Sequence, residues 1–433
     1  MNKLAIIADD LTGASDSGVQ FARKGLATQV LFDLTGLSSV RDIEAIVVDT
    51  DSRSLPALDA YRRVQNAAKL LQEMGFRHLY KKIDSTLRGN IGAEIDAIYD
   101  TIKPTFMIIA PGYPQNGRTI YKGHHFLHDT LLHETELSRD PKCPIKESYV
   151  PSLIAKQTKR PIGLIDYQTL RLGFDKVKEQ LDRYRAIGIP YIIFDSLSEE
   201  DLQDIVRYVC RINEKVVWVG SAGLANYLPE AYHLQKTNKA DMIEPIERPI
   251  LLVVGSVSQV SRKQLDRALS LQNVKGIPVD SIKLASNDQY RYEEMEKAFH
   301  QAEQWAKQGY HVALYSSASP NEIKQVQEIG KSKGLSAIKI SNFISQSLGE
   351  AAARLIQKGY FGAMILTGGD TAKHVCDKIG AKGFELLDEV ETGVPIAKLI
   401  HDSGMYVVTK AGAFGSENTF IQAIHQLKGV DAK

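Results

Sequence analysis

The 433-residue sequence has few cysteines and no long apolar segment. Its three cysteines, Cys143, Cys210 and Cys376, lie far apart and show no C-x-x-C spacing. They cannot form a disulfide framework, so a reducing compartment is expected. No apolar run reaches the roughly 18 residues that a membrane-spanning helix needs. Asp9 also interrupts the N-terminal apolar stretch before a signal peptide could develop. We therefore expect a cytoplasmic protein.

An excess of charge of either sign is also missing. The formal net charge is +1 at pH 7, and no long run of one sign occurs. This balance gives no reason to expect a nucleic-acid or membrane partner. Individual basic residues can still bind a small anionic metabolite.

Several catalytic signatures are absent from the glycine-containing turns. Neither the Walker pattern G-x-x-x-x-G-K-[ST] nor the dinucleotide pattern G-x-G-x-x-G occurs there, which weakens the case for a nicotinamide-dependent oxidoreductase. A serine hydrolase is disfavoured because no G-x-S-x-G elbow is found, and a zinc protease because H-E-x-x-H is missing.

The apolar pattern predicts a two-domain α/β protein, because short apolar runs alternate with amphipathic stretches through most of a chain too long for one ordinary core. The predicted strands are Leu4–Ala8, Gln29–Phe32, Ala45–Asp49, Phe106–Ala110, Tyr191–Phe194, Val216–Val219, Ile250–Val254, His311–Leu314, Ala337–Ile340, Ala363–Leu366 and Met405–Thr409. The predicted helices are Asp59–Met74, Ile91–Tyr99, Glu200–Asn213, Ser261–Leu271, Tyr292–Gln308 and Ile344–Lys358. Each domain should be a largely parallel sheet flanked by helices, with a ligand cleft between the domains.

A polar segment with two prolines predicts the domain boundary. Residues 234–249 lack apolar periodicity and separate two series of elements that each begin with a strand. The N-terminal domain is then residues 1–233 and the C-terminal domain is residues 250–433. Residues 116–151 resist regular assignment and could form a lid or a substrate-side excursion.

Two carboxylates follow the first predicted strand. Asp9 and Asp10 open the sequence D-D-L-T-G-A-S-D, which leads from a strand into a helix. Ligands of open α/β sheets bind beyond the carboxyl ends of strands. The pair could orient substrate hydroxyls or accept a proton, although Asp residues at this position can also simply cap the helix.

A second polar cluster is K-K-I-D-S-T-L-R-G-N, just before the predicted helix at Ile91. Its lysines and arginine suit the carboxylate of a polyhydroxy acid, and its Asp and hydroxyl side chains suit the hydroxyls. A solvated basic loop is the competing interpretation. The predicted substrate-binding residues are Asp9, Asp10, Arg53, Lys81, Lys82, Asp84, Ser85 and Arg88.

Three strand-to-helix turns in the second half are rich in Gly, Ser and Thr: V-V-G-S-V-S, L-T-G-G-D-T-A and T-K-A-G-A-F-G-S. Backbone N–H groups in such turns can bind phosphate, and glycine lets a ligand approach the backbone. One such turn is weak evidence, but three together predict a nucleotide site. The predicted residues are Ser256, Ser258, Thr367, Gly368, Gly369, Asp370, Thr371, Lys410, Gly412 and Gly415.

Four histidines lie close together in residues 124–133. His124 and His128 are spaced i, i+4, as in some helical metal sites, and His125 and His133 are nearby. No cysteine pair completes a zinc set. A structural metal, hydrogen bonding to substrate and a satisfied loop position all stay open.

Together, IADDLTGASDSG, KKIDSTLRGN, APGYPQNGRT, VGSAGLA, VVGSVSQVS, LTGGDTA and KAGAFG resemble the four-carbon acid sugar kinases. The resemblance covers nearly the whole chain. It implies that the N-terminal domain binds D-threonate, D-erythronate or 3-oxo-tetronate. It also implies that the C-terminal domain binds ATP, with Mg²⁺, for transfer to the 4-hydroxyl. The stretch from Leu131 to Glu136 looks more like the threonate and erythronate branch, which favours D-threonate.

For the base that accepts the hydroxyl proton, we favour Asp370, which follows two glycines at a predicted helix start, with Asp9 or Asp10 as alternatives. The ligands of Mg²⁺ are left open. A sugar-acid sensor without catalysis is a different class of function, and the three glycine turns argue against it. The partners expected are thus a small sugar acid and ATP, and a homodimer is a base-rate expectation only.

Overall fold

The computed structural model describes residues 3–34, 43–139, 143–234 and 243–430. The chain divides into two units, residues 1–239 and 240–433. Half of the predicted linker of residues 234–249, namely residues 235–242, lies outside the described residues. Each unit is a parallel-rich sheet flanked by helices, which confirms the predicted fold class. No described helix is long and apolar enough to cross a membrane.

The first unit is built on eight parallel strands in the order β2-β3-β1-β4-β11-β5-β10-β9. Its strands are β1 (Leu4–Ala8), β2 (Thr28–Leu31), β3 (Ala45–Asp49), β4 (His78–Lys82), β5 (Phe106–Ala110), β9 (Ile162–Ile165), β10 (Tyr191–Phe194) and β11 (Val216–Gly220). Most are buried along their whole length, so they read as continuous apolar runs in the sequence.

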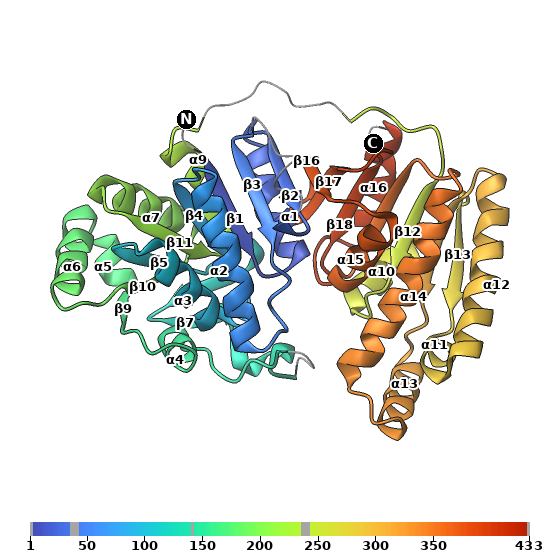
Figure 1. The fold of residues 1–433 in the computed structure, drawn as a ribbon, viewed down its shortest axis with the longest axis horizontal. Coiled ribbons are helices and arrows are strands. Elements are labelled where there is room, and N and C mark those ends of the chain that lie inside the picture. Colours follow the sequence, from blue (N-terminus) through green and yellow to red (C-terminus); the bar gives the residue numbers. More distant parts are fainter. Residues whose placement is uncertain (1–2, 35–42, 140–142, 235–242, 431–433) are drawn as a thin grey trace. The chain divides into compact units, whose positions relative to one another are not determined.

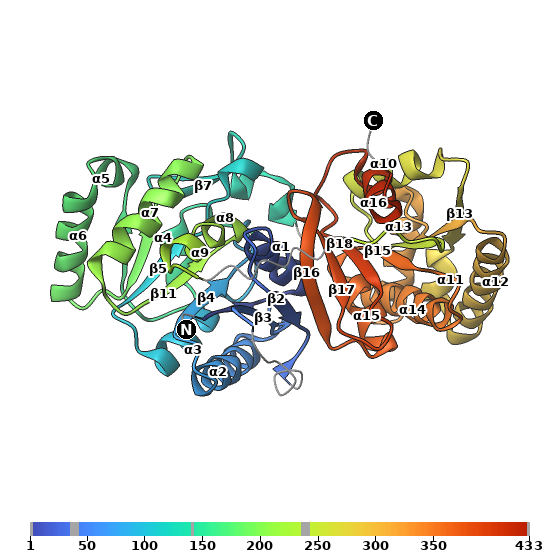
Figure 2. The same cartoon turned by 90° about the horizontal axis from the view of Figure 1, so that it is seen from above.

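Helices cover both faces of this sheet, with α2 and α3 on one face and α1, α7 and α8 on the other (Figures 1 and 2). The helices of this unit are α1 (Leu11–Ala22), α2 (Ala57–Glu73), α3 (Ile91–Ile102), α4 (Val150–Ala155), α5 (Tyr167–Arg171), α6 (Phe174–Ala186), α7 (Glu199–Ile212), α8 (Ala222–Ala225) and α9 (Leu228–Ala231).

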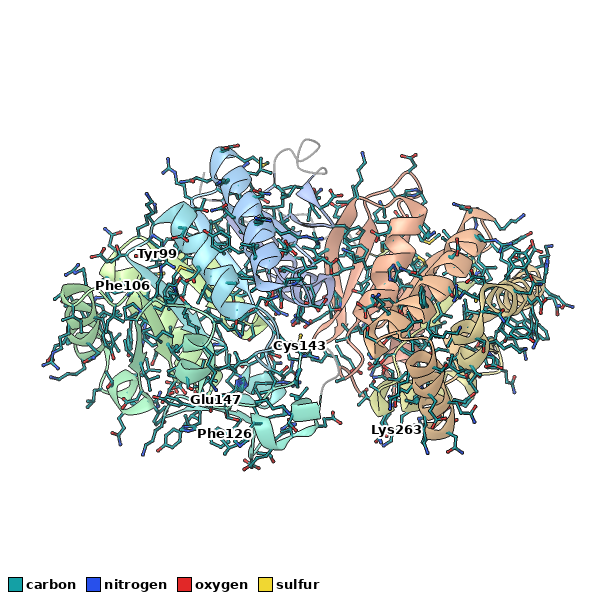
Figure 3. The ribbon with its side chains drawn as sticks, turned by 60° about the horizontal axis from the view of Figure 1, so that its bottom comes forward. Tyr99, Phe106, Phe126, Cys143, Glu147 and Lys263 are labelled. Atoms are coloured by element: carbon teal, nitrogen blue, oxygen red, sulfur yellow. The ribbon has the colours of Figure 1, made fainter. Side chains whose placement is uncertain are left out.

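Residues 116–151, which the sequence left without assignment, contain a small antiparallel sheet. It comprises β6 (Arg118–Tyr121), β7 (His124–Leu127) and β8 (Thr130–Leu131), followed by short 3₁₀ turns. Phe126 in β7, and Cys143 and Glu147 in the segment after the sheet, are labelled in Figure 3. His124 lies in a strand, so the helical register considered for His124 and His128 is wrong.

The second unit contains five parallel strands in the order β13-β14-β12-β15-β18, extended by the antiparallel strands β17 and β16. They are β12 (Ile250–Val254), β13 (Val274–Val279), β14 (His311–Ser316), β15 (Ala363–Thr367), β16 (Gly383–Glu391), β17 (Val394–Leu399) and β18 (Tyr406–Lys410). Helices α14 and α15 pack together on one face, and α10 and α16 pack on the other (Figure 2).

The helices of this unit are α10 (Gln259–Leu269), α11 (Ser281–Ser286), α12 (Asp288–Lys307), α13 (Pro320–Ser332), α14 (Ala337–Gln357), α15 (Gly369–Ile379) and α16 (Thr419–Lys428). The predicted strand Ala337–Ile340 is wrong, because these residues form the first turn of α14. The Ser336 side chain caps this helix by accepting a hydrogen bond from the Lys339 N–H. A four-residue apolar alternation fits one helical turn as well as a short strand, and here the cap decides the outcome.

Strand register determines where the polar turns meet. Ala8 at the end of β1 is level with Asp49 in β3 and with Lys82 in β4. In the second unit, Thr367 in β15 is level with Val254 in β12 and with Lys410 in β18. In each unit, therefore, three polar turns that are far apart in sequence leave the sheet at one edge.

Candidate functional sites in the two units

In the first unit, the guanidinium of Arg53 lies between two carboxylates. Its Nε and Nη2 donate to Asp9 at 2.7 and 3.0 Å, and its Nη1 and Nη2 donate to Asp10 at 2.7 Å each. Asp10 also accepts from the N–H of Gly13 and so caps α1. The capping interpretation is therefore confirmed for Asp10, and the same carboxylate also binds Arg53.

These contacts separate the acidities of the two carboxyl groups. Burial would raise the pKa of Asp9, but the charge and hydrogen bonds of Arg53, helped by Lys81 and Lys82, lower it. The pKa of Asp10 is raised, by burial first and then by the nearby Asp9 and Asp84 charges, although Arg53 opposes this. Asp9 is thus the more firmly ionised member of the pair, and Asp10 is the better proton acceptor.

The loop after β4 holds a second carboxylate–guanidinium pair. Asp84 accepts from Arg88 Nε at 2.6 Å and from Thr86 Oγ1 at 2.5 Å. Burial opposes ionisation of Asp84, but Arg88 and Arg53 hold its pKa well below the usual range. Ser85 is buried directly after Asp84.

Left-handed backbone shapes this loop. Leu87 has a φ of 61°, which is unfavourable for a branched side chain, and the following Gly89 has a φ of 103°. A Cβ on Gly89 would lie 3.1 Å from Cγ of Arg53. Glycine at this position lets the Asp84 loop approach the Arg53 loop closely.

Lys82 brings a cation to the same strand ends. Its Nζ donates to the carbonyl of Ile83 at 2.9 Å, and the residue is almost fully buried. A Cβ on Gly13 would lie 2.7 Å from both Lys82 Nζ and Asp10 Oδ1. Gly13 therefore makes room for an ammonium group beside a carboxylate.

Lys81 has different surroundings. Its Nζ lies 2.8 Å from Glu94 Oε2, and both side chains are buried. Glu94 also accepts from Ser52 Oγ at 2.6 Å, one residue before Arg53. Sequence reasoning missed Glu94, although it shares the buried face of α3 with Ile91 and Ile95, where a carboxylate needs an explanation.

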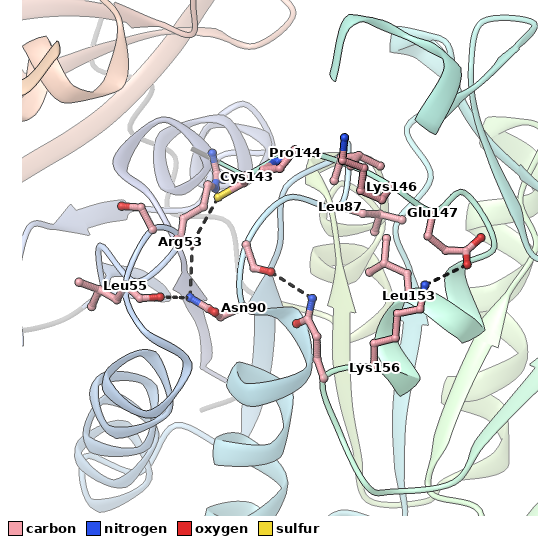
Figure 4. Close-up of a pocket in the computed structure, with 14 residues that line it drawn as sticks. Arg53, Leu55, Leu87, Asn90, Cys143, Pro144, Lys146, Glu147, Leu153 and Lys156 are labelled. Atoms are coloured by element: carbon pink, nitrogen blue, oxygen red, sulfur yellow. Dashed lines mark hydrogen bonds and ion pairs between the residues drawn. The ribbon is translucent and has the colours of Figure 1, made fainter. Parts of the chain in front are cut away.

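A cavity of about 330 Å³ adjoins this cluster (Figure 4). Arg53 is among its lining residues, as are Leu87 and Asn90 from the neighbouring loop. The side-chain amide of Asn90 donates to the carbonyl of Leu55 at 2.7 Å and supports the Arg53 loop. The volume is in the range of small-molecule pockets.

In the second unit, a buried lysine lies where the three glycine turns meet. Lys410 Nζ donates to the hydroxyls of Ser261 at 3.2 Å and Thr367 at 3.4 Å, and to the carbonyl of Gly412 at 3.3 Å. Only 2% of Lys410 is exposed. Burial lowers the pKa of its amine to about 7.

Glycines allow these turns to pack closely against one another. A Cβ on Gly412 would lie 2.3 Å from Ser256 Oγ, and one on Gly255 would lie 2.0 Å from Thr371 Oγ1. Gly368 has a φ of 95°, so glycine suits this turn, and α15 begins at the next residue, Gly369. Close backbone approach, two helix N-termini and a cation together suit a phosphate group.

Helix α10 organises the loop after β18. Ser258 caps α10 and donates to the carbonyl of Gly412 at 2.6 Å, while Ser261 donates to the same carbonyl at 2.9 Å. Gln264, one turn further along, donates to the carbonyls of Phe414 and Ser416. Sequence reasoning missed Ser261 and Gln264 as site-supporting residues, although both lie three residues apart on a helix that follows a glycine turn.

Two other predicted nucleotide residues lie further along these turns. Asp370 is exposed in the first turn of α15. Gly415, with a φ of 82°, is packed against Thr419, and the adjacent Ser416 is bound by Glu391 of β16. The described contacts of Gly415 therefore belong to the turn that leads into α16.

Among the described residues, no group of three or more His, Cys, Asp or Glu side chains could hold a metal ion. His124 Nδ1 is 3.1 Å from the carbonyl of Lys122, and His133 Nδ1 is 2.7 Å from the hydroxyl of Ser148. Both histidines thus have local hydrogen-bond partners.

Comparison with known proteins agrees with this division of roles. A model described as a sugar-binding N-terminal domain matches residues 4–228, and one described as a nucleotide-binding C-terminal domain matches residues 251–420. The chain is 32% identical to a D-threonate kinase from Salmonella typhimurium over 98% of both chains. It is 30% identical to a 3-oxo-tetronate kinase from Burkholderia multivorans, over 98% of this chain and 97% of the relative. It is 29% identical to a D-erythronate kinase from Heliobacterium modesticaldum, over 99% of this chain and 97% of the relative.

Solved structures agree as well. A protein from Salmonella typhimurium LT2, provisionally described as a tRNA synthase, has a TM-score of 0.82 at 27% identity, covering 98% of this chain and 99% of that one. Haemophilus influenzae protein HI1011 has a TM-score of 0.74 at 26% identity, covering 98% of this chain and 100% of that one. Together with the fold, these relatives identify the chain as a two-domain α/β phosphotransferase that acts on an alcohol group. The chain belongs to the four-carbon acid sugar kinase family.

The buried Lys81–Glu94 pair generates a stability prediction. Glu94→Ala leaves the Lys81 ammonium without its carboxylate in a site closed to water, so it should destabilise the first unit by about 3–5 kcal/mol. The double variant Lys81→Met with Glu94→Leu removes both charges and should recover most of that loss. Chemical unfolding followed by the fluorescence of the buried Trp218, in a Trp305→Phe background, measures both. A Glu94→Ala loss below about 1 kcal/mol would contradict the role of this pair.

Proposed function

We propose that this protein is an ATP-dependent kinase that phosphorylates the 4-hydroxyl of a four-carbon sugar acid, with D-threonate as the preferred substrate. The observation that carries the proposal is the buried Lys410 amine at the meeting point of three glycine-containing turns. A buried lysine amine of this kind suits a phosphate. The names of the curated relatives support the class of substrate.

The sugar acid would bind at the strand ends of the first unit. Lys82 and Arg88 would bind the substrate carboxylate or its hydroxyls, and Arg53 would hold the carboxylates of Asp9 and Asp10 in place beside them. Asp9, Asp10, Asp84 and Ser85 would orient hydroxyls. Lys81 would act indirectly, through Glu94 and the Ser52–Arg53 turn.

ATP would bind at the glycine turns of the second unit. The turn residues Ser256, Ser258 and Gly412, together with Thr367–Thr371, would surround its phosphates, and Lys410 would supply positive charge. Mg²⁺ usually keeps several waters and takes one or two protein carboxylates together with phosphate oxygens. This is compatible with a described structure that has no preformed cluster of metal ligands.

The reaction transfers the γ-phosphoryl group to the substrate oxygen. A bond forms between the 4-hydroxyl oxygen and the γ-phosphorus, the bond to the bridging oxygen of ADP breaks, and a carboxylate takes the hydroxyl proton. Asp370, exposed at the start of α15, is our candidate for that base. Asp10, whose pKa is raised by burial, is the alternative in the first unit.

A substrate panel tests the function. The protein is mixed with Mg-ATP and, in turn, D-threonate, D-erythronate, L-threonate and 3-oxo-tetronate, and ADP formation is measured. We expect the highest kcat/KM with D-threonate. A higher value with D-erythronate or 3-oxo-tetronate would move the assignment within the family. Binding of a sugar acid without ADP formation would indicate a sensor, and an absorbance change with NAD or NADP would indicate an oxidoreductase.

Replacement of Asp370 tests the base. Asp370→Asn keeps the shape of the side chain but removes its ability to take a proton, so kcat should fall by about 10²-fold or more while KM changes little. Asp10→Asn is the matched comparison in the first unit. Near-normal kcat for Asp370→Asn would remove that residue from the role.

The low pKa of Lys410 predicts proton uptake when a nucleotide binds. With a pKa of about 7, the amine is mostly neutral at pH 8, and the negative charge of bound phosphate should raise that pKa. Binding of a non-hydrolysable ATP analogue should therefore take up as much as one proton near pH 8 and almost none at pH 6, where the amine is already charged. Calorimetry in two buffers with different ionisation enthalpies measures the uptake. Lys410→Met should abolish it, and equal uptake by this variant would refute the assignment.

A further inference from the structure

One histidine in the first unit is buried without a hydrogen-bond partner for its ring. His125 is 0% exposed, and neither Nδ1 nor Nε2 has a partner among the described residues. Its backbone N–H donates to the carbonyl of Ser148 at 2.8 Å, so the strand at this position is fixed. A buried polar ring without partners costs free energy and needs an explanation.

The neighbouring histidines have structural explanations that His125 lacks. His124 is exposed, bonds the Lys122 carbonyl and packs against Tyr149. His133 bonds Ser148, and His128 occupies the space above Gly117, where a Cβ would lie 2.4 Å from its Nδ1. Packing and local bonds thus account for three of the four histidines.

Strand topology and electrostatics relate His125 to the candidate sugar-acid site. In the hairpin, His125 pairs with Ile120, so these two side chains lie on the same face. Arg118, two residues before Ile120 in the same strand, lies on that face too. Strands β4 and β5 are both parallel to β11, which lies between them. The segment that leads from β5 to this hairpin therefore leaves the sheet at the same edge as the Asp84 loop, which follows β4. Asp84 and Arg118 both act electrostatically on the His125 ring.

The ring is neutral at physiological pH. Burial, together with the positive charge of Arg118, outweighs the attraction of Asp84 and lowers the pKa of His125 to about 3. A neutral imidazole offers one donor and one acceptor. This combination matches a hydroxyl group, which also donates and accepts, and is a poor match for a carboxylate or phosphate.

We propose that His125 is a substrate-binding residue whose ring hydrogen-bonds a non-reacting hydroxyl of the sugar acid, at C2 or C3, beside Asp84. This inference rests on the proposed kinase function and names a residue that distinguishes hydroxylated from deoxygenated acids. Bound substrate then supplies the partner that the ring lacks in the free protein. A site with a buried polar group for a hydroxyl strongly rejects the analogue without that hydroxyl.

The test compares His125→Leu and His125→Gln with the wild-type protein. D-Threonate binding is measured by calorimetry without nucleotide, and kcat and KM are measured with Mg-ATP. His125→Leu should bind D-threonate about 10- to 100-fold more weakly. Its melting temperature without ligand should be unchanged or higher, because an unpartnered polar ring has been replaced by an apolar group of similar size. His125→Gln retains a donor and an acceptor and should recover part of the affinity.

Deoxy analogues identify the hydroxyl. If the ring contacts the C2 hydroxyl, wild type and His125→Leu should bind the 2-deoxy acid with equal affinity; if it contacts the C3 hydroxyl, the same should hold for the 3-deoxy acid. In each case the hydrogen bond to the ring is absent from the complexes of both proteins. Since the ring is neutral, the ratio of wild-type to His125→Leu affinity should also stay constant from pH 5.5 to 8. An imidazolium contact would instead weaken as pH rises through about 6.5.

His124→Gln, on the exposed face of the same strand, is the matched control and should behave as wild type. Wild-type affinity in His125→Leu would overturn the inference while leaving the kinase proposal intact. Loss of affinity together with a lower melting temperature, without recovery in His125→Gln, would indicate a structural role and would also overturn it. Failure of the wild-type protein to form ADP with every acid in the panel would instead overturn the proposed function.

Discussion

The first unit depends on one arrangement of charges, the Arg53 guanidinium held between Asp9 and Asp10. It joins the turns after β1 and β3, and Asp84, from the turn after β4, lies 3.9 Å from the same guanidinium. Three carboxylates near one another, two of them buried, would repel strongly without this cation. Arg53 therefore makes the cluster possible, and it differentiates the pKa values of Asp9 and Asp10.

The surrounding structure supports Arg53 through close packing and buried bonds. Gly13 and Gly89 leave room where any side chain would meet Lys82 or Arg53. Behind these loops, Glu94 connects Lys81 to Ser52, so α3 helps to hold the turn that carries Arg53. Positioning of this kind is the main requirement of phosphoryl-transfer enzymes, where the protein supplies orientation and charge.

The second unit uses the opposite electrostatic arrangement. Among the residues that the structure describes, Lys410 hydrogen-bonds to hydroxyls and a carbonyl and to no carboxylate, so its charge is costly in the free protein. A bound phosphate would remove that cost. The two units thus differ in how they hold charge: the first pairs its cations with carboxylates, and the second buries a lysine whose pKa is lowered to about 7.

The sequence by itself determined the α/β class, the strands that are continuous apolar runs, and the polar motifs that follow them. Strands such as Leu4–Ala8 and Ile250–Val254 were predictable because buried parallel strands have a distinctive local composition. Local pattern failed at Ala337–Ile340, where a serine cap and a long helix outweighed a short alternation. Only the tertiary structure decided which polar residues meet: Lys81 faces Glu94 while the adjacent Lys82 lies beside Asp10, and His125 is the buried histidine of its group. These outcomes depend on strand register and on contacts between residues distant in the chain, which composition and spacing do not encode.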